Sequence, residues 1–350
     1  MKAQKLNQGN FEGKRVLVRC DFNVPIENGK VLDDFRILKA LDTIKFLIEK
    51  KAKVILISHF GDPEGKRIES LSLDPVAKRL EELLNQKVKK LNEAIGEEVE
   101  KEVSSMKEGE VLLLENIRFY PGEENCDLEF GENLAKLGEL FVNEAFSVCH
   151  RKHASVYLLP KLLPSFFGFQ LERELENLEN FLKNYQRPLV CLIGGKKIKD
   201  KAPLVKKFSE IGDWVLVNHL IWEELIKSQI EIEHKEKILP PVDGVDENKD
   251  IGEKTLEIFK EKIKSAKTIF WNGPFGKIEE EKYSKGTKEL AMAILESSAF
   301  SLIGGGETIE FANRLKITEK FSFASTGGGA MLKFLAGEKL PGLEALGYYE

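Results

Sequence analysis

Short runs of β-branched and apolar residues alternate along this chain with long, charged, amphipathic stretches. The stretch 33–51 repeats apolar residues at helical spacing, and the run KVILI (53–57) that follows it has the composition of a buried strand. The same succession continues along the chain, with strand-like runs at 15–19, 53–57, 111–114, 139–143, 188–193, 213–217, 268–271, 300–303 and 321–324. This alternation predicts an α/β fold in which helices cover both faces of parallel sheets.

The strand-like runs form two sets, and a charged helical stretch lies between them. The chain has 350 residues, which at roughly 150 residues per domain favours two domains. The segment LERELENLENFLKN (171–184) is predicted to be the helix that joins them. We therefore expect an N-terminal domain over 1–170, a connecting helix over 171–184 and a C-terminal domain over 185–335.

The composition argues against several classes of protein. The net charge of −5 gives no sign of a nucleic-acid partner, and no apolar stretch reaches the ~18–20 residues that a membrane span requires. Residues 1–15 lack the apolar region of a secretory signal. The four cysteines are scattered without a CxxC pair, so neither a disulfide framework nor a zinc site is expected. These features predict a cytoplasmic protein without nucleic-acid or membrane partners.

The segments that follow the predicted strands differ between the two halves of the chain. Ligands of parallel α/β sheets bind outside the carboxyl ends of the strands. In the first half these ends carry Asp, Asn, His and Arg, in CDFNVP (20–25), SHFGDP (58–63), ENIRFY (115–120) and NEAFSVCHRKH (143–153). In the second half they carry glycines, in GGKK (194–197), NGP (272–274), GGGET (304–308) and TGGG (326–329). The pattern predicts a small anion held by side chains in one domain, nucleotide phosphates against backbone N–H groups in the other, and a two-substrate reaction.

The basic residues of the first half have two interpretations. Arg36, Arg118, Arg151 and His59 lie at or near strand ends, where guanidinium groups bind phosphate or carboxylate in a bidentate manner. Any one of them alone is more typical of a solvated surface ion pair. Asp21 and Asn23 either form a turn or bind substrate hydroxyls, and the spacing leaves both open. A metal pair at His150 and His153 lacks a third ligand and is not expected.

The second half carries candidate phosphate ligands beside its glycines. Lys197 and Lys201 lie four residues apart on one helical face after a glycine turn, where they reach phosphates or simply form an exposed lysine-rich helix end. Neither the P-loop pattern nor GxGxxG after a strand is present. Glu307 begins a predicted helix, so it is either a favourable first-turn charge or an oxygen ligand of Mg²⁺.

Taken in order, eight motifs resemble those of the phosphoglycerate kinase family: DFNVP, SHFGDP, LLENIRF, NEAFSVCHRKHAS, GGKKIKDK, WNGPFGKIE, GGGET and STGGGA. They extend over nearly the whole chain. The resemblance implies two Rossmann-like, three-layer domains joined by a helix, with a cleft between them and the tail 336–350 packing back on the N-terminal domain. It implies reversible phosphoryl transfer between 1,3-bisphosphoglycerate and ADP, giving 3-phosphoglycerate and ATP, with Mg²⁺ bound to the nucleotide. Domain closure and a monomeric state are also expected from it.

The resemblance also assigns roles to individual positions. In the N-terminal domain, the substrate contacts it implies are Asp21, Asn23 and Arg36 at the glycerate end, and His59, Arg118 and Arg151 at the phosphate. The nucleotide contacts it implies are Lys197, Lys201, Asn272, Glu279 (at the ribose), Gly305, Gly306, Glu307 and Thr308, with Gly327–Gly329 in a further phosphate-facing loop. The catalytic set is Arg36, Lys197, Gly305 and Gly328, and the expected Mg²⁺ ligand is Glu307.

Three departures from the family pattern bear on function. Asp62 stands where the family has Arg, and we expect Lys66 or Arg67 to supply the missing positive charge. The chain after Val217 reads NHLIWEELIK and lacks the family's glycine-rich turn and a long following segment, which places nucleotide affinity and base preference in question. Glu307 replaces the family's Asp, a change we expect to retune Mg²⁺ binding.

Two other functions fit the same residues. The departures at Asp62 and after Val217 favour a catalytically weakened or inactive phosphoglycerate-kinase-like binding protein as the alternative. A kinase of the same fold that acts on a different small acid is a third hypothesis, because Asp62 would favour a substrate with less phosphate charge.

Overall fold

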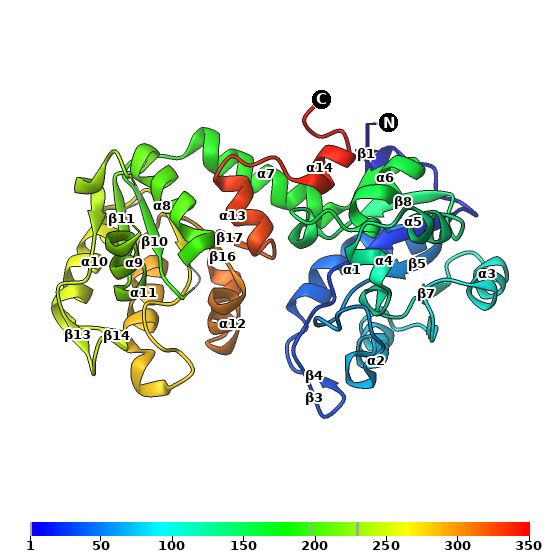
Figure 1. Cartoon of the computed structure of the whole chain (residues 1–350), viewed down its shortest axis with the longest axis horizontal. Coiled ribbons are helices and arrows are strands. Elements are labelled where there is room, and N and C mark those ends of the chain that lie inside the picture. Colours follow the sequence, from blue (N-terminus) through cyan, green and yellow to red (C-terminus); the bar gives the residue numbers. More distant parts are fainter. Residues whose placement is uncertain (1, 197, 229–230) are drawn as a thin grey trace. The chain divides into compact units, whose positions relative to one another are not determined.

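The computed structural model describes residues 2–196, 198–228 and 231–350, with the side chains of 198–200 excluded (Figure 1). The chain divides into two compact units: one contains the residues up to Leu175 together with Lys339–Glu350, and the other contains Glu176–Glu338. Each unit is built around its own sheet. No helix of the described residues is long and apolar enough to span a membrane.

The first unit contains a seven-stranded sheet in which every neighbouring pair is parallel. Its strand order is β1 (Gln4–Lys5), β9 (Ser165–Phe167), β8 (Leu140–Asn143), β2 (Arg15–Arg19), β5 (Lys53–Ile57), β7 (Val111–Leu113) and β6 (Val88–Lys90). The helices of this unit are α1 (Phe35–Glu49), α2 (Asp74–Leu84), α3 (Glu97–Ser104), α4 (Pro121–Glu124), α5 (Leu128–Ala135), α6 (Leu159–Leu162) and α14 (Pro341–Ala345). A small hairpin joins β3 (Ile26–Glu27) to β4 (Lys30–Val31).

Both faces of this sheet are buried, which explains why its central strands are continuous apolar runs. Along β2, Val16 and Val18 pack into one hydrophobic cluster while Leu17 packs into another on the opposite face. Along β5, Val54 and Leu56 belong to the first cluster and Ile55 to the second. Alternating side chains of one strand thus fill two separate cores, as expected of a parallel sheet covered by helices.

The second unit contains a six-stranded parallel sheet. Its strand order is β12 (Ile238–Leu239), β11 (Trp214–Val217), β10 (Leu189–Ile193), β15 (Thr268–Asn272), β16 (Phe300–Gly304) and β17 (Phe323–Ser325). Its helices are α8 (Ile198–Ile211), α9 (His219–Lys227), α10 (Glu253–Ser265), α11 (Lys285–Glu296), α12 (Gly306–Arg314) and α13 (Gly329–Leu335), and β13 (Gly244–Val245) pairs with β14 (Asp250–Ile251). Trp271 and Phe259 lie in the core between the sheet and α10. The prediction of two parallel-sheet α/β domains is confirmed.

Helix α7 (Phe169–Asn184) belongs to the first unit at its start and to the second at its end. It begins two residues before the predicted 171 because buried side chains satisfy its first N–H groups: Thr43 Oγ1 accepts from Phe169 N at 2.9 Å, and Glu144 Oε1 accepts from Gln170 N at 3.1 Å. In the chain's C-terminal segment, Gly342 N donates to Cys149 O at 2.9 Å, which ties α14 to the loop after β8.

Candidate functional site

The loops that follow β2 and β5 are joined by hydrogen bonds that backbone N–H groups donate to uncharged side chains. Phe22 N donates to Ser58 Oγ at 2.9 Å, and Gly61 N donates to Asn23 Oδ1 at 3.0 Å. The two strands are neighbours in the sheet, so their carboxyl ends lie at one edge. The predicted substrate residues of both motifs therefore gather in one place, which we call the first half-site.

Asp21 is a buried carboxylate that holds Arg36. Its Oδ2 accepts from Arg36 Nη1 at 2.7 Å and from Ser147 Oγ at 2.5 Å, while its Oδ1 accepts from Asn23 N at 3.1 Å. Burial alone would raise the pKa of Asp21, but the charge of Arg36 and these hydrogen bonds bring it below its usual range. The turn interpretation of Asp21 is confirmed by the bond from Asn23 N to its Oδ1, while its Oδ2 positions an arginine; its binding of substrate hydroxyls stays a prediction.

His59 is buried next to the fully buried guanidinium of Arg19. The Nη2 of Arg19 lies 3.3 Å from His59 Nδ1. Arg has no acceptor, so Nδ1 must accept this hydrogen bond, which leaves the proton of the neutral ring on Nε2. Burial, followed by the positive charge of Arg19, lowers the pKa of His59 well below its ordinary value. His59 is therefore a neutral N–H donor.

Arg118 is buried in the same half-site. Its Nη1 donates to Gly61 O at 2.6 Å, and its Nε lies 3.4 Å from Glu124 Oε1. Burial, followed by the nearby charge of Arg151, lowers the pKa of Arg118. Arg151 itself is exposed. Two guanidinium groups close enough to perturb each other form an arrangement suited to a doubly charged anion such as a phosphate.

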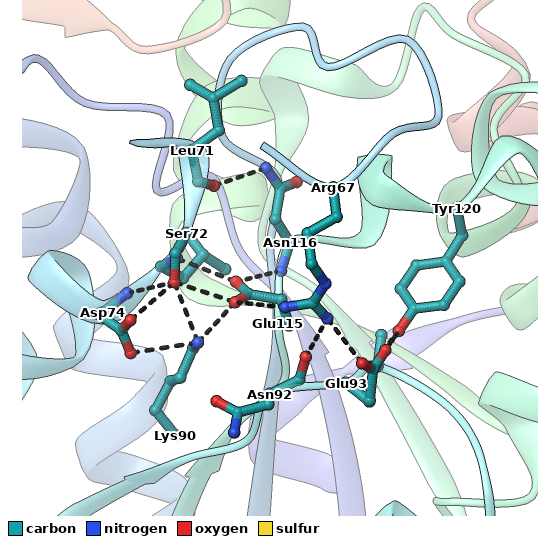
Figure 2. Close-up of polar contacts among 12 residues, drawn as sticks. Arg67, Leu71, Ser72, Asp74, Lys90, Asn92, Glu93, Glu115, Asn116 and Tyr120 are labelled. Carbon is teal, nitrogen blue, oxygen red and sulfur yellow. Dashed lines mark hydrogen bonds and ion pairs between the residues drawn. The ribbon is translucent and has the colours of Figure 1, made fainter. Parts of the chain in front are cut away.

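The expected replacement of the missing arginine takes a different form in the structure. Asp62 is exposed and acts electrostatically on Arg118. Arg67 donates to Asn92 O and to Glu93 Oε1, the latter at 2.8 Å (Figure 2). Its guanidinium also lies over the Phe119 ring. The Nη2 donor of Arg67 is thus committed elsewhere. Lys66, which is exposed, is left as the candidate for compensating Asp62.

In the second unit, the glycine loops after the strands fit tightly against one another, and this set of loops is the second half-site. Gly194 N donates to Asn272 O, and Asn272 Nδ2 donates to Gly304 O at 2.6 Å. Gly305 has φ +103°, and a Cβ added there would lie 2.4 Å from Asn272 Nδ2. Asn272 Oδ1 is buried and has no hydrogen-bond partner among the described residues. It is an acceptor available to a ligand.

The glycines of this half-site serve two different purposes. A Cβ added at Gly304 would lie 2.5 Å from the sulfur of Met331, so a side chain here would have to displace the end of this α13 methionine from β16. Apart from the adjacent backbone, no atom of the described residues lies within 4 Å of a Cβ built at Gly306, which begins α12, or at Gly328, which precedes α13. These two positions leave open space beside helix N-termini, where a phosphate is favoured by the backbone N–H groups.

Charged residues border the same loops. Lys201 is buried, and its Nζ donates to Gly194 O. A Cβ built at Gly195 would lie 2.7 Å from Lys201 Nζ and 3.2 Å from Glu307 Oε2, so an ammonium and a carboxylate both flank this glycine. Glu279 is exposed and its Oε1 pairs with Lys196 Nζ at 2.9 Å.

Of the predicted nucleotide contacts, Thr308 is described by the structure and Lys197 is not. Thr308 is buried and its Oγ1 accepts from Gly273 N at 2.7 Å, so it fixes the loop after β15. Lys197, the predicted catalytic lysine, lies outside the described residues. Within those residues no group of three or more His, Cys, Asp and Glu side chains is arranged to hold a metal ion.

Sequence reasoning missed several residues that build these half-sites. Arg19 and Ser147 have no sequence pattern that marks them, because their partners are distant in the chain. Asn218 had a readable signal: an Asn that follows a strand and precedes an apolar helical run is typical of an N-cap. Its Oδ1 accepts from Ile221 N at 3.0 Å, and its Nδ2 donates to Gly195 O at 3.2 Å. Helix α9 thus starts immediately after β11, with Asn218 as its N-cap.

Comparisons with known proteins agree with this arrangement. The sequence model of the phosphoglycerate kinase family matches residues 6–235 and 219–338. The phosphoglycerate kinase of Dictyoglomus turgidum is 43% identical over 386 residues, covering 97% of each chain, and that of Coprothermobacter proteolyticus is 40% identical over 390 residues, covering 99% of each. Among solved structures, the phosphoglycerate kinase from Pyrococcus horikoshii superposes with a TM-score of 0.89 at 31% identity, covering 98% of each chain. That from Coxiella burnetii superposes with a TM-score of 0.80 at 31% identity and 99% coverage.

The same comparisons locate the missing segment. The alignments extend over 386 and 390 positions, although the chain has only 350 residues, so the relatives carry residues that are absent here. The two matched ranges overlap at 219–235. The family pattern is therefore interrupted at α9 and the chain that follows it.

Proposed function

The chain belongs to the phosphoglycerate kinase family, and from this premise we propose how its own residues divide the work of the reaction. The reaction is a reversible phosphoryl transfer between 1,3-bisphosphoglycerate and ADP, in which the carboxyl group of 3-phosphoglycerate is the acceptor in the reverse direction. Such a reaction asks the protein mainly to position two anions and to stabilise charge on the transferring group.

The first half-site binds the phosphoglycerate. Arg118, Arg151 and the neutral His59 donate to its phosphate, and Arg36, held by Asp21, lies at the glycerate end. The observation that carries this assignment is the convergence of buried donors: the neutral His59 and Arg118 are 3% and 4% exposed, and Arg118 Nε makes no hydrogen bond within the described part of the chain, although Glu124 Oε1 lies 3.4 Å away. Buried donors of this kind are costly without a hydrogen-bond acceptor.

The second half-site binds the nucleotide phosphates. The N–H groups beside Gly306 and Gly328, the ammonium of Lys201 and the free acceptor Asn272 Oδ1 support this assignment. Glu307, in the first turn of α12, would hold Mg²⁺ together with phosphate oxygens. When bound, the ion neutralises charge on the phosphates; the residues of the chain do the rest.

Transfer joins a carboxylate oxygen of 3-phosphoglycerate to the γ-phosphorus of ATP while the bond from that phosphorus to ADP breaks. Arg36 and Lys197 stabilise the charge on the three equatorial oxygens, and the backbone N–H groups at Gly305 and Gly328 assist them. Direct in-line transfer requires the exclusion of water, because otherwise ATP would be hydrolysed. The domain closure that would provide this exclusion stays a prediction, as do the monomeric state and the cytoplasmic location.

A catalytically weakened or inactive binding protein is the second candidate. Asp62 and the missing segment after Val217 favour it, because they affect one substrate each. In this case the protein would bind 3-phosphoglycerate or the nucleotide without turnover.

Turnover of the purified protein tests the proposal. ATP, Mg²⁺ and 3-phosphoglycerate are supplied, and 1,3-bisphosphoglycerate formation is coupled to NADH oxidation through glyceraldehyde-3-phosphate dehydrogenase. The Lys197→Ala variant is the matched control, and loss of one cation that stabilises the transition state lowers kcat by about 100- to 1,000-fold. Absence of turnover at millimolar substrates, from protein shown to be folded, would overturn the proposal in favour of the second candidate.

A further inference from the structure

One buried side chain holds the backbone of the loop after β5 from both sides. Asn116 Oδ1 accepts from Phe60 N at 3.2 Å, and Asn116 Nδ2 donates to Phe60 O at 2.7 Å. Asn116 is fully buried, so both bonds are sheltered from water. The amide thus pairs with Phe60 as a neighbouring strand would, although the loop has left the sheet.

The remaining capacity of the Asn116 amide is also used. Its Nδ2 donates to Leu71 O at 3.0 Å, and its Oδ1 accepts from Arg118 N at 3.1 Å. An Asn side chain has two donors and two acceptor positions, and here all four are filled. A single residue therefore links the start of the loop, its end and the short helical turn that carries Arg118.

The preceding residue fastens the far end of the same loop. The buried carboxylate of Glu115 accepts from Leu73 N at 3.0 Å, from Ser72 Oγ at 3.0 Å and from Lys90 Nζ at 2.5 Å (Figure 2). Figure 2 shows Lys90 also reaching Asp74, and the ion pair measures 3.1 Å. The pair Glu115–Asn116 thus ties residues 60–73 to the end of β7.

The loop after β5 also provides the backbone carbonyl to which the Arg118 guanidinium donates a hydrogen bond. Gly61, next to Phe60, accepts from Arg118 Nη1 at 2.6 Å and donates to Asn23 Oδ1. Asn116 consequently holds Arg118 at two points: directly, through the backbone N–H of Arg118, and indirectly, through the carbonyl on which the guanidinium rests. His59 precedes Phe60, so its backbone is held by the same bonds.

We propose that Asn116 is a positioning residue for substrate binding, which sets the guanidinium of Arg118 and the ring of His59 in register for one phosphate. The inference rests on the proposed role of the first half-site. The amide of Asn116 has no hydrogen-bonding position left for a substrate, because all four are filled by the protein. It acts by keeping two donors from different strands at a fixed separation, with the Glu115 cluster as its anchor.

Two substitutions separate this role from a local one. Asn116→Ser keeps an oxygen at the start of the turn, a favourable N-cap for Arg118 N, but is too short to reach Phe60 and Leu71. Asn116→Asp keeps both acceptor bonds and replaces the two donors by an oxygen that faces two carbonyls. The control is Tyr120→Phe, which removes the bonds of the Tyr120 hydroxyl to Glu93 and Ala94 but no hydrogen bond to residues 60–73.

The measurement is the split between KM and kcat. Because small misplacements of binding groups cost up to ~100-fold, both Asn116 variants should raise the KM for 3-phosphoglycerate by about 10- to 100-fold. The KM for ATP should stay within about twofold of wild type, and so should every parameter of Tyr120→Phe. Hydrogen exchange of residues 60–73 should accelerate in the Asn116 variants alone.

Other outcomes would overturn the inference. If the Asn116 variants fold with a lowered Tm but keep the KM for 3-phosphoglycerate, the side chain is only structural. If neither folds, Glu115→Gln, which keeps its size and one acceptor oxygen, decides the question by the same KM criterion. Absence of turnover in the wild-type protein would instead reject the proposed function, and a KM raised by Arg118→Lys but not by the Asn116 variants would reject the positioning role alone.

Discussion

Replacing Asp62 should improve binding of the phosphoglycerate. Asp62 follows β5, is exposed, and lies close enough to Arg118 for its charge to raise the pKa that burial and Arg151 lower. A carboxylate at this place repels the phosphate that Arg118 is proposed to bind. Asp62→Asn removes the negative charge, and Asp62→Arg reverses it.

The magnitude follows from the exposure of the site. Two unit charges ~4 Å apart interact by about 1 kcal/mol in water and about 4 kcal/mol at an effective dielectric constant near 20. Asp62 is exposed, so we take the lower value for each unit of charge. At 1.4 kcal/mol per factor of ten, Asp62→Asn should lower the KM for 3-phosphoglycerate by about fivefold and Asp62→Arg by about 25-fold.

The assay is the coupled turnover at saturating ATP, at low and at high salt. The gain should shrink as salt rises, because the Debye length is only ~10 Å at 0.1 M ionic strength. Arg67→Gln is the control: since Arg67 is bonded to Glu93 and Asn92, its loss should leave this KM within about twofold of wild type. A KM unchanged in Asp62→Arg would refute the reasoning, and a large loss in Arg67→Gln would show that Arg67 reaches the substrate.

Three further results are expected. Gly305→Ala places a Cβ 2.4 Å from Asn272 Nδ2 at a φ of +103°. This should lower the free energy of unfolding by about 1–3 kcal/mol, as measured by denaturant titration. Gly306→Ala, with open space around the added Cβ, should lower it far less. Burial, followed by the charges of Arg118 and Arg19, lowers the pKa of His153 from 6.5 to about 3. The folded state therefore favours the neutral ring, and its contribution to stability is complete above pH 6.5 and is lost as the pH falls below 6.5. His153→Gln should accordingly flatten the acid side of a plot of Tm against pH. Arg36→Met should lower kcat by about 100-fold, as expected for a cation that stabilises transition-state charge, and should raise the pKa of Asp21, which NMR titration would detect; an unchanged kcat would place Arg36 outside the reaction.

The central strands could be predicted from the sequence because a strand that is buried on both faces consists of a continuous run of apolar residues. KVILI at β5 and LVCLI at β10 are such runs, and each matches a strand to within a residue. The edge strands β1 (QK) and β6 (VKK) were missed for the converse reason. They are short, carry lysines and take strand geometry only because a neighbouring strand offers hydrogen bonds.

The sequence predicted where the residues of each half-site lie in the sheet, but it did not predict which side chains bond to one another. Residues directly after parallel strands must gather at one edge of the sheet, so Asp21 and Arg118 were found from order alone. The partner of a side chain follows no such rule. Ser147 bonds to Asp21, which lies 126 residues away in the sequence. Arg67 binds Glu93, although Arg67 belongs to the loop after β5 that carries the predicted substrate residue His59. Likewise, nothing in the letters distinguishes Gly304, which is packed against Met331, from Gly306, which faces open space.

The balance of charge in the first half-site explains why Asp62 should matter. Arg36 is neutralised by Asp21 at 2.7 Å, and Glu124 lies 3.4 Å from Arg118. His59 is neutral because its pKa is lowered by burial. Among the residues that the structure describes, the side chains of Arg151 and of the buried Arg19 enter no ion pair, and of the two only Arg151 is exposed. Asp62 therefore opposes part of the electrostatic attraction for the phosphate, and directed hydrogen bonds from Arg118 and His59 supply the rest of the proposed binding.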